Sequence, residues 1–254
     1  RAVQVKHYFK IPIKRLPYTD GAEAALEDMI RRECDPSEIG FVIMECEQGE
    51  GGYRPAPARM VKDIRRVTRK YSIPLIVDEV QAGMGRTGKW WAYEHYGIEP
   101  DIQTCAKALQ VAATVANKRM FPTEKSAISS TWGGGHIIDM AMGCAVIQEI
   151  KKQKLLQNAT HQGKVIRGWM EDLEEDYSII RDPRGMGLMQ AFDLPNVEMR
   201  NKFQEECFQQ GLIVLGCGTQ GIRIAPALNV KNSEIEEGMR IIECAAAKFG
   251  GKKE

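Results

Sequence analysis

Two hydrophobic patterns alternate along the first 150 residues. Short continuous apolar runs at 41–45 and 73–77 predict strands, because buried parallel strands are apolar on both faces. A short strand is also expected at 101–106, and a strand of small residues at 112–117. Between the first two runs, apolar residues at Met60, Ile64 and Val67 recur at helical spacing and predict a helix over 57–71. This order of strand, helix and strand predicts parallel pairing, because the connection is long enough for a crossover.

Two further helices are expected in this part. One begins after Asp20, which we expect to cap it, and runs through Leu26 and Ile30. The other is a long apolar helix from Ile138 to Ile150, which follows a glycine-rich turn. Together these elements predict an α/β fold with a largely parallel sheet.

From about residue 155 the pattern becomes that of charged amphipathic helices and short strands. It predicts helices around Trp169, Phe203 and Met239, a pair of strands within 179–193, and further strands at 212–215 and 221–225. We therefore divide the chain into residues 1–154 and a smaller α/β domain at 155–254. Only the tail at 250–254 is expected to be disordered.

Composition narrows the class of protein. The chain has 254 residues, 43% of them hydrophobic, and 35 basic and 34 acidic residues give a net charge of +1. Because the charges are interspersed, neither nucleic acid nor a membrane surface is expected as the main partner. Seven scattered cysteines and four separated histidines predict buried thiols and no metal site, and no secretory or membrane-spanning run is present. We expect a cytoplasmic protein.

A carboxylate stands at the end of the second strand. Asp78 follows the run at 73–77, and Lys107 follows the next strand. Ligands of α/β sheets bind outside the carboxyl ends of the strands, so both side chains would face a ligand. A carboxylate that protonates a pyridine ring and a lysine that holds its aldehyde would suit pyridoxal phosphate. The alternative is that Asp78 caps a turn and Lys107 is a surface lysine.

Three other features are compatible with a site. Glycines at 49, 51 and 52 surround Glu50 and allow close backbone approach to a ligand, although a plain turn would use the same residues. The segment 129–135 leads into a helix and suits either a phosphate or an ordinary helix cap. Arg223 lies inside an apolar strand and needs an anionic partner, which a structural ion pair would also supply.

The motifs themselves resemble those of class III (omega-amino acid) aminotransferases. The resemblance rests on Asp78-Glu-Val-Gln-Ala-Gly-Met-Gly-Arg-Thr-Gly-Lys89, on Ala106-Lys107, and on Glu45-Cys-Glu-Gln-Gly-Glu-Gly-Gly52. Cys46 and Glu47 depart from the proline and apolar residue usual there. Lys107-Ala-Leu-Gln-Val111 and Thr131-Trp-Gly-Gly134 are most similar to the lysine 6-aminotransferase and 4-aminobutyrate aminotransferase branch.

This resemblance implies a fold-type I pyridoxal-phosphate transferase and a role for each matching residue. Lys107 would bind the cofactor covalently and act as acid and base, Asp78 would pair with the pyridinium, Val80 would pack on the ring and Gln81 would bond its hydroxyl region. Thr131 would hold the phosphate of a neighbouring subunit in a homodimer.

Two substrate residues follow from the same resemblance. Glu50 would be a gate that pairs with Arg223 when an omega-amine enters, and Arg223 would bind the α-carboxylate of glutamate or 2-oxoglutarate. The implied activity is transfer of a terminal amino group, from lysine, ornithine or 4-aminobutyrate, to 2-oxoglutarate.

The resemblance begins part-way into the family's large domain, so the chain matches its C-terminal portion. The substrate-binding N-terminal segment, the phosphate-binding helix start and the aromatic residue stacked on the ring would lie upstream. Two alternatives remain: an amino-acid racemase of the same fold, and a fragment that is active only with a partner half.

Overall fold

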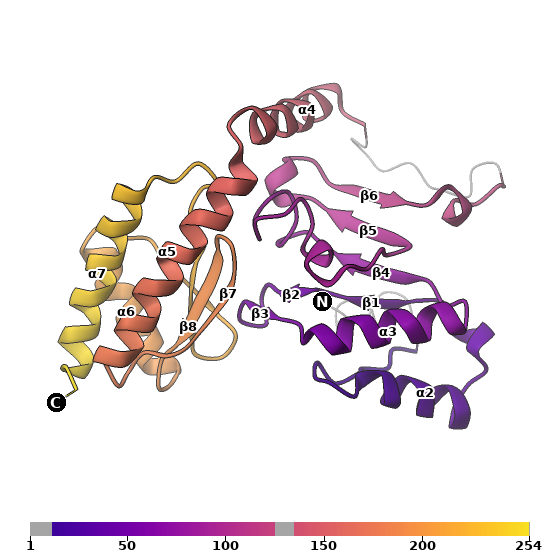
Figure 1. The fold of residues 1–254 in the computed structure, drawn as a ribbon, viewed down its shortest axis with the longest axis horizontal. Coiled ribbons are helices and arrows are strands. Elements are labelled where there is room, and N and C mark those ends of the chain that lie inside the picture. The colour runs from indigo at the N-terminus through magenta and orange to yellow at the C-terminus, as the bar shows by residue number, and fades with distance from the viewer. Residues whose placement is uncertain (1–11, 125–134, 254) are drawn as a thin grey trace.

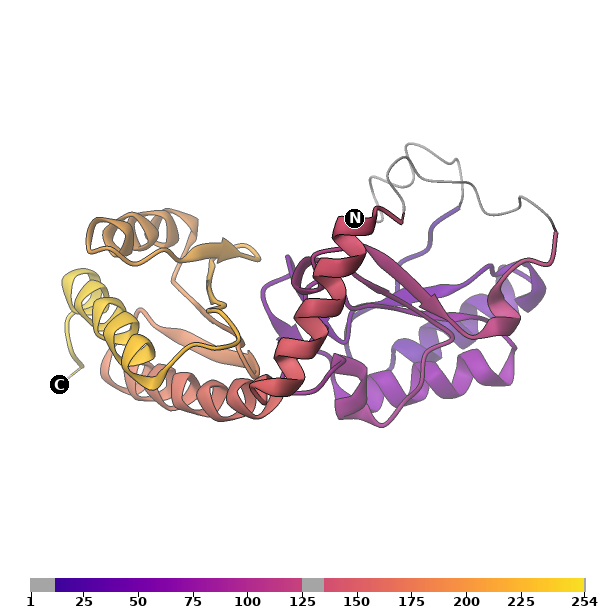
Figure 2. The ribbon, with the colours of Figure 1, turned by 90° about the horizontal axis from the view of Figure 1, so that it is seen from above.

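The structure, a computed structural model, describes residues 12–124 and 135–253. Its two regions lie side by side along the longest axis of the molecule (Figures 1 and 2). The first is built on one four-stranded sheet and the second on another. Helices α4 (Ile137–Lys152) and α5 (Leu155–Asp176) connect them. The α/β class predicted from the sequence is confirmed.

The first sheet has the strand order β1-β4-β5-β6. Its strands are β1 (Val42–Met44), β4 (Leu75–Asp78), β5 (Ile102–Cys105) and β6 (Ala113–Ala116). β4 pairs in parallel with both β1 and β5, whereas β6 is antiparallel to β5. The predicted strand-helix-strand crossover is confirmed, and the carboxyl ends of β1, β4 and β5 meet at one edge.

Two helices pack together beside this sheet, α2 (Ala22–Arg32) and α3 (Ala58–Lys70). The apolar stripe of α3 is buried as predicted, with Met60, Ile64 and Val67 each no more than 3% exposed. The basic residues of α3 mostly face solvent. Arg65 is the exception, since it is buried against Asp101 with a 2.6 Å ion pair.

Asp20 caps a different helix from the one expected. Helix α2 begins after Gly21, whose φ of +92° is left-handed, and receives no side-chain cap. Instead the Asp20 carboxylate accepts a hydrogen bond of 3.1 Å from the backbone N–H of Met60, in the first turn of α3. A cap motif identifies a carboxylate that suits a helix start, but tertiary packing decides which helix it serves.

Both edges of the first sheet expose apolar side chains. Phe41 and Ile43 are 50% and 53% exposed at the β1 edge, and Val115 is 51% exposed on β6. Parallel strands are normally covered on both faces. Among the residues that the structure describes, part of this sheet is left uncovered.

The second sheet is antiparallel and has the strand order β7-β8-β10-β9. Its elements are β7 (Arg181–Met186), β8 (Met189–Asp193), α6 (Val197–Gln209), β9 (Leu215–Cys217), β10 (Gly221–Ile224) and α7 (Asn232–Gly250). Helices α5, α6 and α7 bury Ile166, Phe203 and Met239 in a common core. The sequence pattern located all of these elements, except that β9 lies three residues beyond the predicted start at 212.

The tail and two cysteines differ from expectation. Lys252 bridges to Tyr177, and the backbone N–H of Lys253 donates to the carbonyl of Asp176 at 2.8 Å, so the tail is paired up to that residue. Cys144 and Cys244 are exposed, although buried thiols were predicted. Cysteine is usually buried as a small apolar side chain, but the spacing of these two on α4 and α7 places them on the outer faces.

The shorter elements join these parts. They are η1 (Pro36–Glu38), β2 (Glu47–Gln48), β3 (Arg54–Pro55), η2 (Ala92–Tyr96), η3 (Lys107–Leu109) and η4 (Lys118–Met120). β2 and β3 form an antiparallel hairpin, and its connection at 49–53 is named here the Glu50 loop. Within η2 the side chain of Tyr96 is buried.

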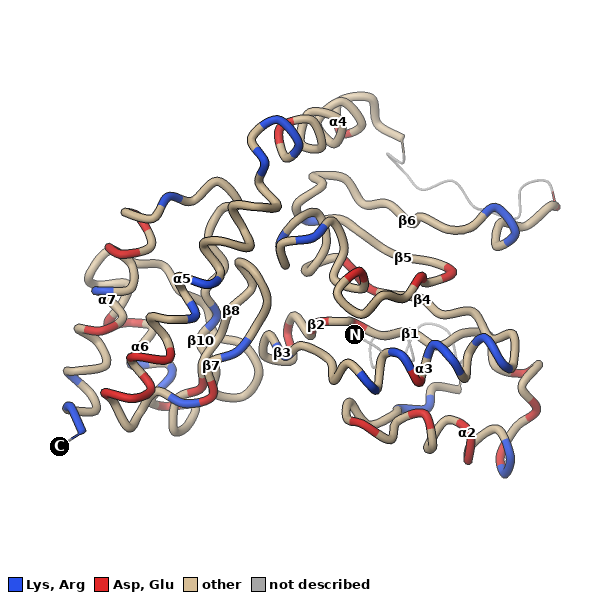
Figure 3. Tube along the Cα trace, in the orientation of Figure 1, with Lys and Arg blue, Asp and Glu red and all other residues tan. Residues whose placement is uncertain are grey.

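Charges of both signs occur along α3, α6 and α7 (Figure 3). No helix among the described residues is long and apolar enough to cross a bilayer. Within the same residues, no group of three or more histidine, cysteine, aspartate or glutamate side chains is arranged to hold a metal ion.

Candidate active site

Residues from two segments of the chain, 45–51 and 78–81, line one pocket at the carboxyl edge of the first sheet. The pocket has a volume of about 270 Å³ and is lined by Glu45, Gln48, Glu50, Gly51, Asp78 and Gln81. Glu45 and Asp78 follow the ends of β1 and β4, so parallel pairing of these strands brings their carboxylates to the same edge. Three of the residues singled out from the sequence therefore share one cavity.

Asp78 is held by its own turn and by the neighbouring strand. Its Oδ1 atom accepts hydrogen bonds from the backbone N–H of Val80 at 3.0 Å and from the Thr104 hydroxyl at 3.1 Å. The first of these bonds is the turn cap that the sequence left open as an alternative. The second fixes the carboxylate against β5, because Thr104 is the cross-strand partner of Asp78.

Glu50 connects the two regions of the molecule. Its Oε1 atom accepts a hydrogen bond of 2.8 Å from Gln81 Nε2 and lies 3.2 Å from Nη1 of Arg223 on β10. The bond from Gln81, and after it the interactions with Arg223 and Lys107, hold the pKa of Glu50 below its ordinary value. The structure thus brings Glu50 and Arg223 together, and it adds Gln81, whose bond to Glu50 the sequence did not indicate.

Gly49 makes the contact between Gln81 and the Glu50 loop possible. A Cβ atom at this position would lie 2.5 Å from the side-chain amide carbon of Gln81, which is closer than real Cβ contacts come. The glycine is required here for close approach rather than for its backbone angle.

Lys107 begins the short helix η3, directly after β5, and its side chain is exposed. The preceding Ala106 has φ −156° and ψ −93°, which ends the strand abruptly. The charge of Lys107 is close enough to Glu50 to contribute to the lowered pKa of that carboxyl. The lysine therefore faces the pocket region from the next strand end.

Val80 and Thr131 complete the predicted set. Val80 is half-buried in the turn after β4, next to Asp78. Thr131 lies outside the described residues, together with the rest of the segment 125–134.

Tyr53 supports Arg223 from the end of the Glu50 loop and was not singled out from the sequence. Its ring is 5% exposed and lies 5.8 Å, centroid to guanidinium carbon, from Arg223. Such a cation–π contact stabilises a guanidinium over an aromatic face. Burial raises the pKa of Tyr53. The advance signal was an aromatic residue placed directly after Gly51 and Gly52.

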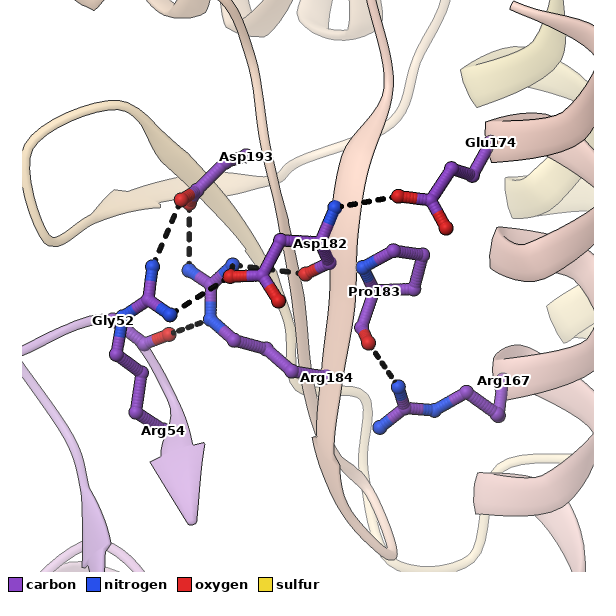
Figure 4. A network of polar contacts seen from close by, with 8 residues as sticks. All are labelled: Gly52, Arg54, Arg167, Glu174, Asp182, Pro183, Arg184 and Asp193. Carbon is purple, nitrogen blue, oxygen red and sulfur yellow. Dashed lines mark hydrogen bonds and ion pairs between the residues drawn. The ribbon is translucent and has the colours of Figure 1, made fainter. Parts of the chain in front are cut away.

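A closed ring of four charges crosses the junction beside this pair, and we call it the charge ring (Figure 4). It alternates Arg54, Asp182, Arg184 and Asp193, with N–O distances of 2.7, 3.1, 2.7 and 2.9 Å around the ring. Arg54 comes from β3, whereas the other three come from β7 and β8 of the second sheet. Each charge has two opposite partners, which compensates for the burial of Arg184 and Asp193, whose side chains are 8% and 14% exposed.

Two buried carboxylates lie behind the site. Glu47 is 1% exposed, accepts a bond of 3.1 Å from the backbone N–H of Met186, and has no partner for Oε2 among the described residues. Glu79 is 2% exposed and accepts the backbone N–H groups of Ala92 and Tyr93. Burial raises the pKa of Glu79 to about 7 and that of Glu47 well above its ordinary value.

The donor set fits the ring side of the cofactor expected from the sequence. A carboxylate at the pocket wall can hold a pyridinium proton, and a primary amine at the adjacent strand end can reach an aldehyde. Asp78 is fixed by two donors on Oδ1, so its orientation is set before any ligand enters. The phosphate side falls on residues outside the described ranges.

Comparison with known proteins gives a consistent result. A family model described as aminotransferase class-III matches residues 3–246. The 5-aminovalerate aminotransferase of Pseudomonas putida is 32% identical over 238 residues, which is 88% of this chain and 56% of the relative. The L-lysine-epsilon aminotransferase of Amycolatopsis lactamdurans is 33% identical over 260 residues, which is 95% of this chain and 57% of the relative.

Solved structures share the fold as well. The acetylornithine aminotransferase of Elizabethkingia anophelis superposes with a TM-score of 0.86 at 28% identity, and the match covers 93% of this chain and 60% of that one. The chain spans little more than half the length of these relatives.

Proposed function

We propose that this chain, which belongs to the class-III aminotransferase family, forms the C-terminal part of an enzyme that moves a terminal amino group from an omega-amino acid to a 2-oxo acid. The observation that carries the proposal is the convergence of Asp78, Gln81 and Glu50 on one pocket, where Arg223 pairs with Glu50 and Lys107 stands at the next strand end. Related chains are named for lysine, 5-aminovalerate and acetylornithine, which all carry an amine far from a carboxylate.

Pyridoxal phosphate, when bound, supplies an aldehyde for the amine and an electron-accepting ring that stabilises negative charge at the substrate carbon. We assign Asp78 to the ring nitrogen, Val80 to the ring face and Lys107 to the aldehyde. Gln81 is assigned to the ring hydroxyl region and Thr131 to the phosphate of a neighbouring subunit. The hydrogen bonds from Val80 and Thr104 hold the Asp78 carboxylate in one orientation, which supports its assignment.

The Lys107 side chain is the proton carrier. As a neutral amine it takes a proton from the substrate carbon beside the ring and returns it to the carbon that bore the aldehyde. Its exposed position at the start of η3 leaves the Nζ atom free to move between these two carbons.

Arg223 and Glu50 distinguish the two classes of substrate. When an omega-amine enters, no α-carboxylate is near the reacting carbon, and Glu50 occupies Arg223 as observed. When glutamate or 2-oxoglutarate enters, Arg223 turns its planar pair of donors to the α-carboxylate and Glu50 withdraws. A racemase does not need to bind the α-carboxylate of a second substrate in this way, so the Glu50–Arg223 pair favours amino transfer.

Three larger-scale features belong to the same proposal. We place a domain boundary between residues 154 and 155, supported by the left-handed Lys154 (φ 54°) that breaks the path between α4 and α5. A homodimer with shared sites is supported by Ile137 and Ile138 on α4, which are 80% and 60% exposed. Lysine, ornithine and 4-aminobutyrate are the proposed donors, and the cytoplasm is the proposed location.

The test is cofactor capture by the full-length protein. With pyridoxal phosphate added, we expect a new absorbance band near the visible edge, and reduction with borohydride should leave the cofactor's mass on Lys107 in a peptide map. The Lys107→Ala variant is expected to show neither. Glutamate release from 2-oxoglutarate and each donor then identifies the activity. A band and adduct at another lysine, or racemisation without glutamate release, would refute the proposal.

A further inference from the structure

The Glu50 loop contacts the second sheet through its backbone as well as through its side chains. The carbonyl of Gly52 accepts a hydrogen bond of 2.7 Å from Arg184 Nε, and the carbonyl of Glu50 accepts one of 2.9 Å from the backbone N–H of Gly218. Both donors belong to the second-sheet region. The position of Glu50 is therefore set by the opposite side of the junction and not by its own sheet alone.

Arg184 is the centre of these contacts. Its side chain is 8% exposed and uses Nε for Gly52, Nη1 for the carbonyl and carboxylate of Asp182, and Nη2 for Asp193 at 2.7 Å. A guanidinium is rigid and planar, so fixing it on two aspartates also fixes the direction of its Nε–H. That N–H points at the Glu50 loop.

Glycines provide the room for this arrangement. A Cβ atom on Gly52 would lie 3.2 Å from Arg184 Nη2, and one on Gly221 would lie 3.1 Å from the same atom. Gly52 also has a φ of +112°, which other residues resist. The loop and β10 are thus shaped around the guanidinium.

The bulge in β7 supplies the second carboxylate. The register shifts between Arg181 and Arg184, and Asp182 adopts a left-handed φ of 52° within this irregularity. A bulge changes the direction of a side chain relative to a regular strand. Here the Asp182 carboxylate reaches both Arg54 and Arg184 across the junction.

Arg184 and Arg223 also share a row of the second sheet. Both are paired with Ala191, Arg184 through β7 and Arg223 through β10. Opposite residues in neighbouring strands point to the same face, so the two guanidiniums lie on the face that meets the Glu50 loop. Arg184 is neutralised by two aspartates, whereas among the described residues Arg223 pairs with one carboxylate, that of Glu50.

We propose that Arg184 is a positioning residue for the Glu50–Arg223 pair: anchored by Asp182 and Asp193, it holds the Gly52 carbonyl and so sets the distance of Glu50 from Arg223. It touches neither substrate nor cofactor. This inference rests on the proposed function, in which Glu50 alternates between pairing with Arg223 and release. Loss of the anchor lets the loop drift and changes the balance between the two substrate classes.

The experiment is a double-mutant cycle in the full-length enzyme. The measured quantity is the ratio of kcat/KM for the glutamate half-reaction to that for the omega-amine half-reaction, in the parent, Arg184→Lys, Glu50→Gln and the double variant. Arg184→Lys keeps the charge but loses the planar Nε donor. We expect it to change the ratio about fivefold. Because Arg184 acts through Glu50, the double variant should match Glu50→Gln alone.

Arg167→Lys is the matched control. Arg167 also donates to β7, to the carbonyls of Pro183 and Gly185, but it comes from α5 and neither of these hydrogen bonds involves the Glu50 loop (Figure 4). In Arg167→Lys the ratio of the two kcat/KM values should stay within about twofold of the parent ratio. Arg54→Gln is the second test variant, because Arg54 is 43% exposed and its loss is better tolerated by folding. It should change the ratio in the same direction as Arg184→Lys.

A readout without cofactor separates the two proposals. In the apo protein, carbon NMR of the Glu50 carboxyl should report a higher pKa in Arg184→Lys than in the parent and no change in Arg167→Lys. If the parent transfers no amino group, the proposed function fails while this titration still tests Arg184. An unchanged ratio and an unchanged Glu50 pKa in folded Arg184→Lys and Arg54→Gln, or effects that multiply in the double variant, would overturn the inference.

Discussion

The charge ring and the Glu50–Arg223 pair lie next to each other and are bonded very differently. In the charge ring every arginine has two aspartates and every aspartate two arginines, and Arg184 is almost completely buried. In the pair a single contact of 3.2 Å joins the groups, Glu50 is 66% exposed, and the buried Arg223 Nε atom has no acceptor among the described residues.

This difference distinguishes a rigid group of contacts, the charge ring, from a contact that can open, the Glu50–Arg223 pair. A buried group with all its hydrogen bonds made is costly to move, because each broken bond leaves an unsatisfied charge. A half-exposed carboxylate with one ionic contact can leave at small cost, since water replaces its partner. The fold therefore concentrates rigidity in the charge ring and leaves freedom of movement to Glu50.

Breaking the charge ring should have the largest effect. Asp193→Asn leaves two guanidiniums with one shared aspartate, and we expect the free energy of unfolding to fall by about 3 kcal/mol. Urea unfolding followed by circular dichroism measures it. Asp182→Asn is the internal control, because that side chain is 51% exposed and its loss should cost less than about 1 kcal/mol. Equal losses in both variants would mean that burial does not distinguish the two aspartates.

Breaking the pair should affect catalysis more than stability. In Glu50→Ala we expect kcat/KM of the omega-amine half-reaction to fall about tenfold, because Arg223 is left uncovered, and the glutamate half-reaction to change less. Single-turnover spectroscopy of each half-reaction in the full-length enzyme measures both. Equal losses in the two half-reactions would exclude a gate role for Glu50.

Glu47 extends the comparison to a third contact across the junction, and its effect should be smaller. Burial raises the pKa of Glu47 well above 4.5, so folding favours its neutral form. The stabilisation by this neutral form is complete below pH 4.5 and is lost as the pH rises through the folded pKa. Between pH 5 and pH 8 the free energy of unfolding should fall more in the parent than in Glu47→Gln, by on the order of 1 kcal/mol. Urea titrations at the two pH values test this. Glu79 titrates in both proteins and cancels, and parallel pH curves would contradict the assignment.

The smallest expected effect concerns the acid strength of Glu50. The hydrogen bond from Gln81 is the largest single interaction that lowers its pKa, ahead of the hydrogen bond from Arg223, and we expect Gln81→Leu to raise the Glu50 pKa further than Arg223→Gln. Because the pKa of Glu50 is depressed, its ionised and hydrogen-bonded carboxylate persists as the pH falls through 4.5, and loss of a bond should move the pKa upward. Carbon NMR of the carboxyl resolves the order, and a reversed order would make the ion pair the main influence.

Local pattern was enough to predict most of the elements. Apolar runs located β1, β4 and β5, and the stripe of Met60, Ile64 and Val67 located α3, because these signals depend on residues near one another in the chain. Asp20 shows where such reasoning stops. Its cap chemistry was right, but the helix that it serves begins near Met60, 40 residues later, and no short pattern encodes that contact.

The charge ring was not predictable for the same reason. Arg54 meets Asp182 and Asp193 across 128 and 139 positions of sequence, and none of the four residues has a distinctive spacing. The pairing of Glu50 with Arg223 was anticipated only through family resemblance. Its geometry, including the part played by Gln81, required the fold. The functional roles of all the site residues stay predictions: Lys107, Asp78, Val80, Gln81, Thr131, Glu50 and Arg223.

The bare apolar edges of the first sheet have a practical consequence for handling the chain. Phe41, Ile43 and Val115 offer half of their surface to solvent on strands that end a sheet, which is the geometry that recruits strands from other molecules. This chain produced alone should be prone to self-association at high concentration. Co-expression with the remainder of a full-length relative, or Lys substitutions at Ile43 and Val115, should increase the yield of dispersed protein.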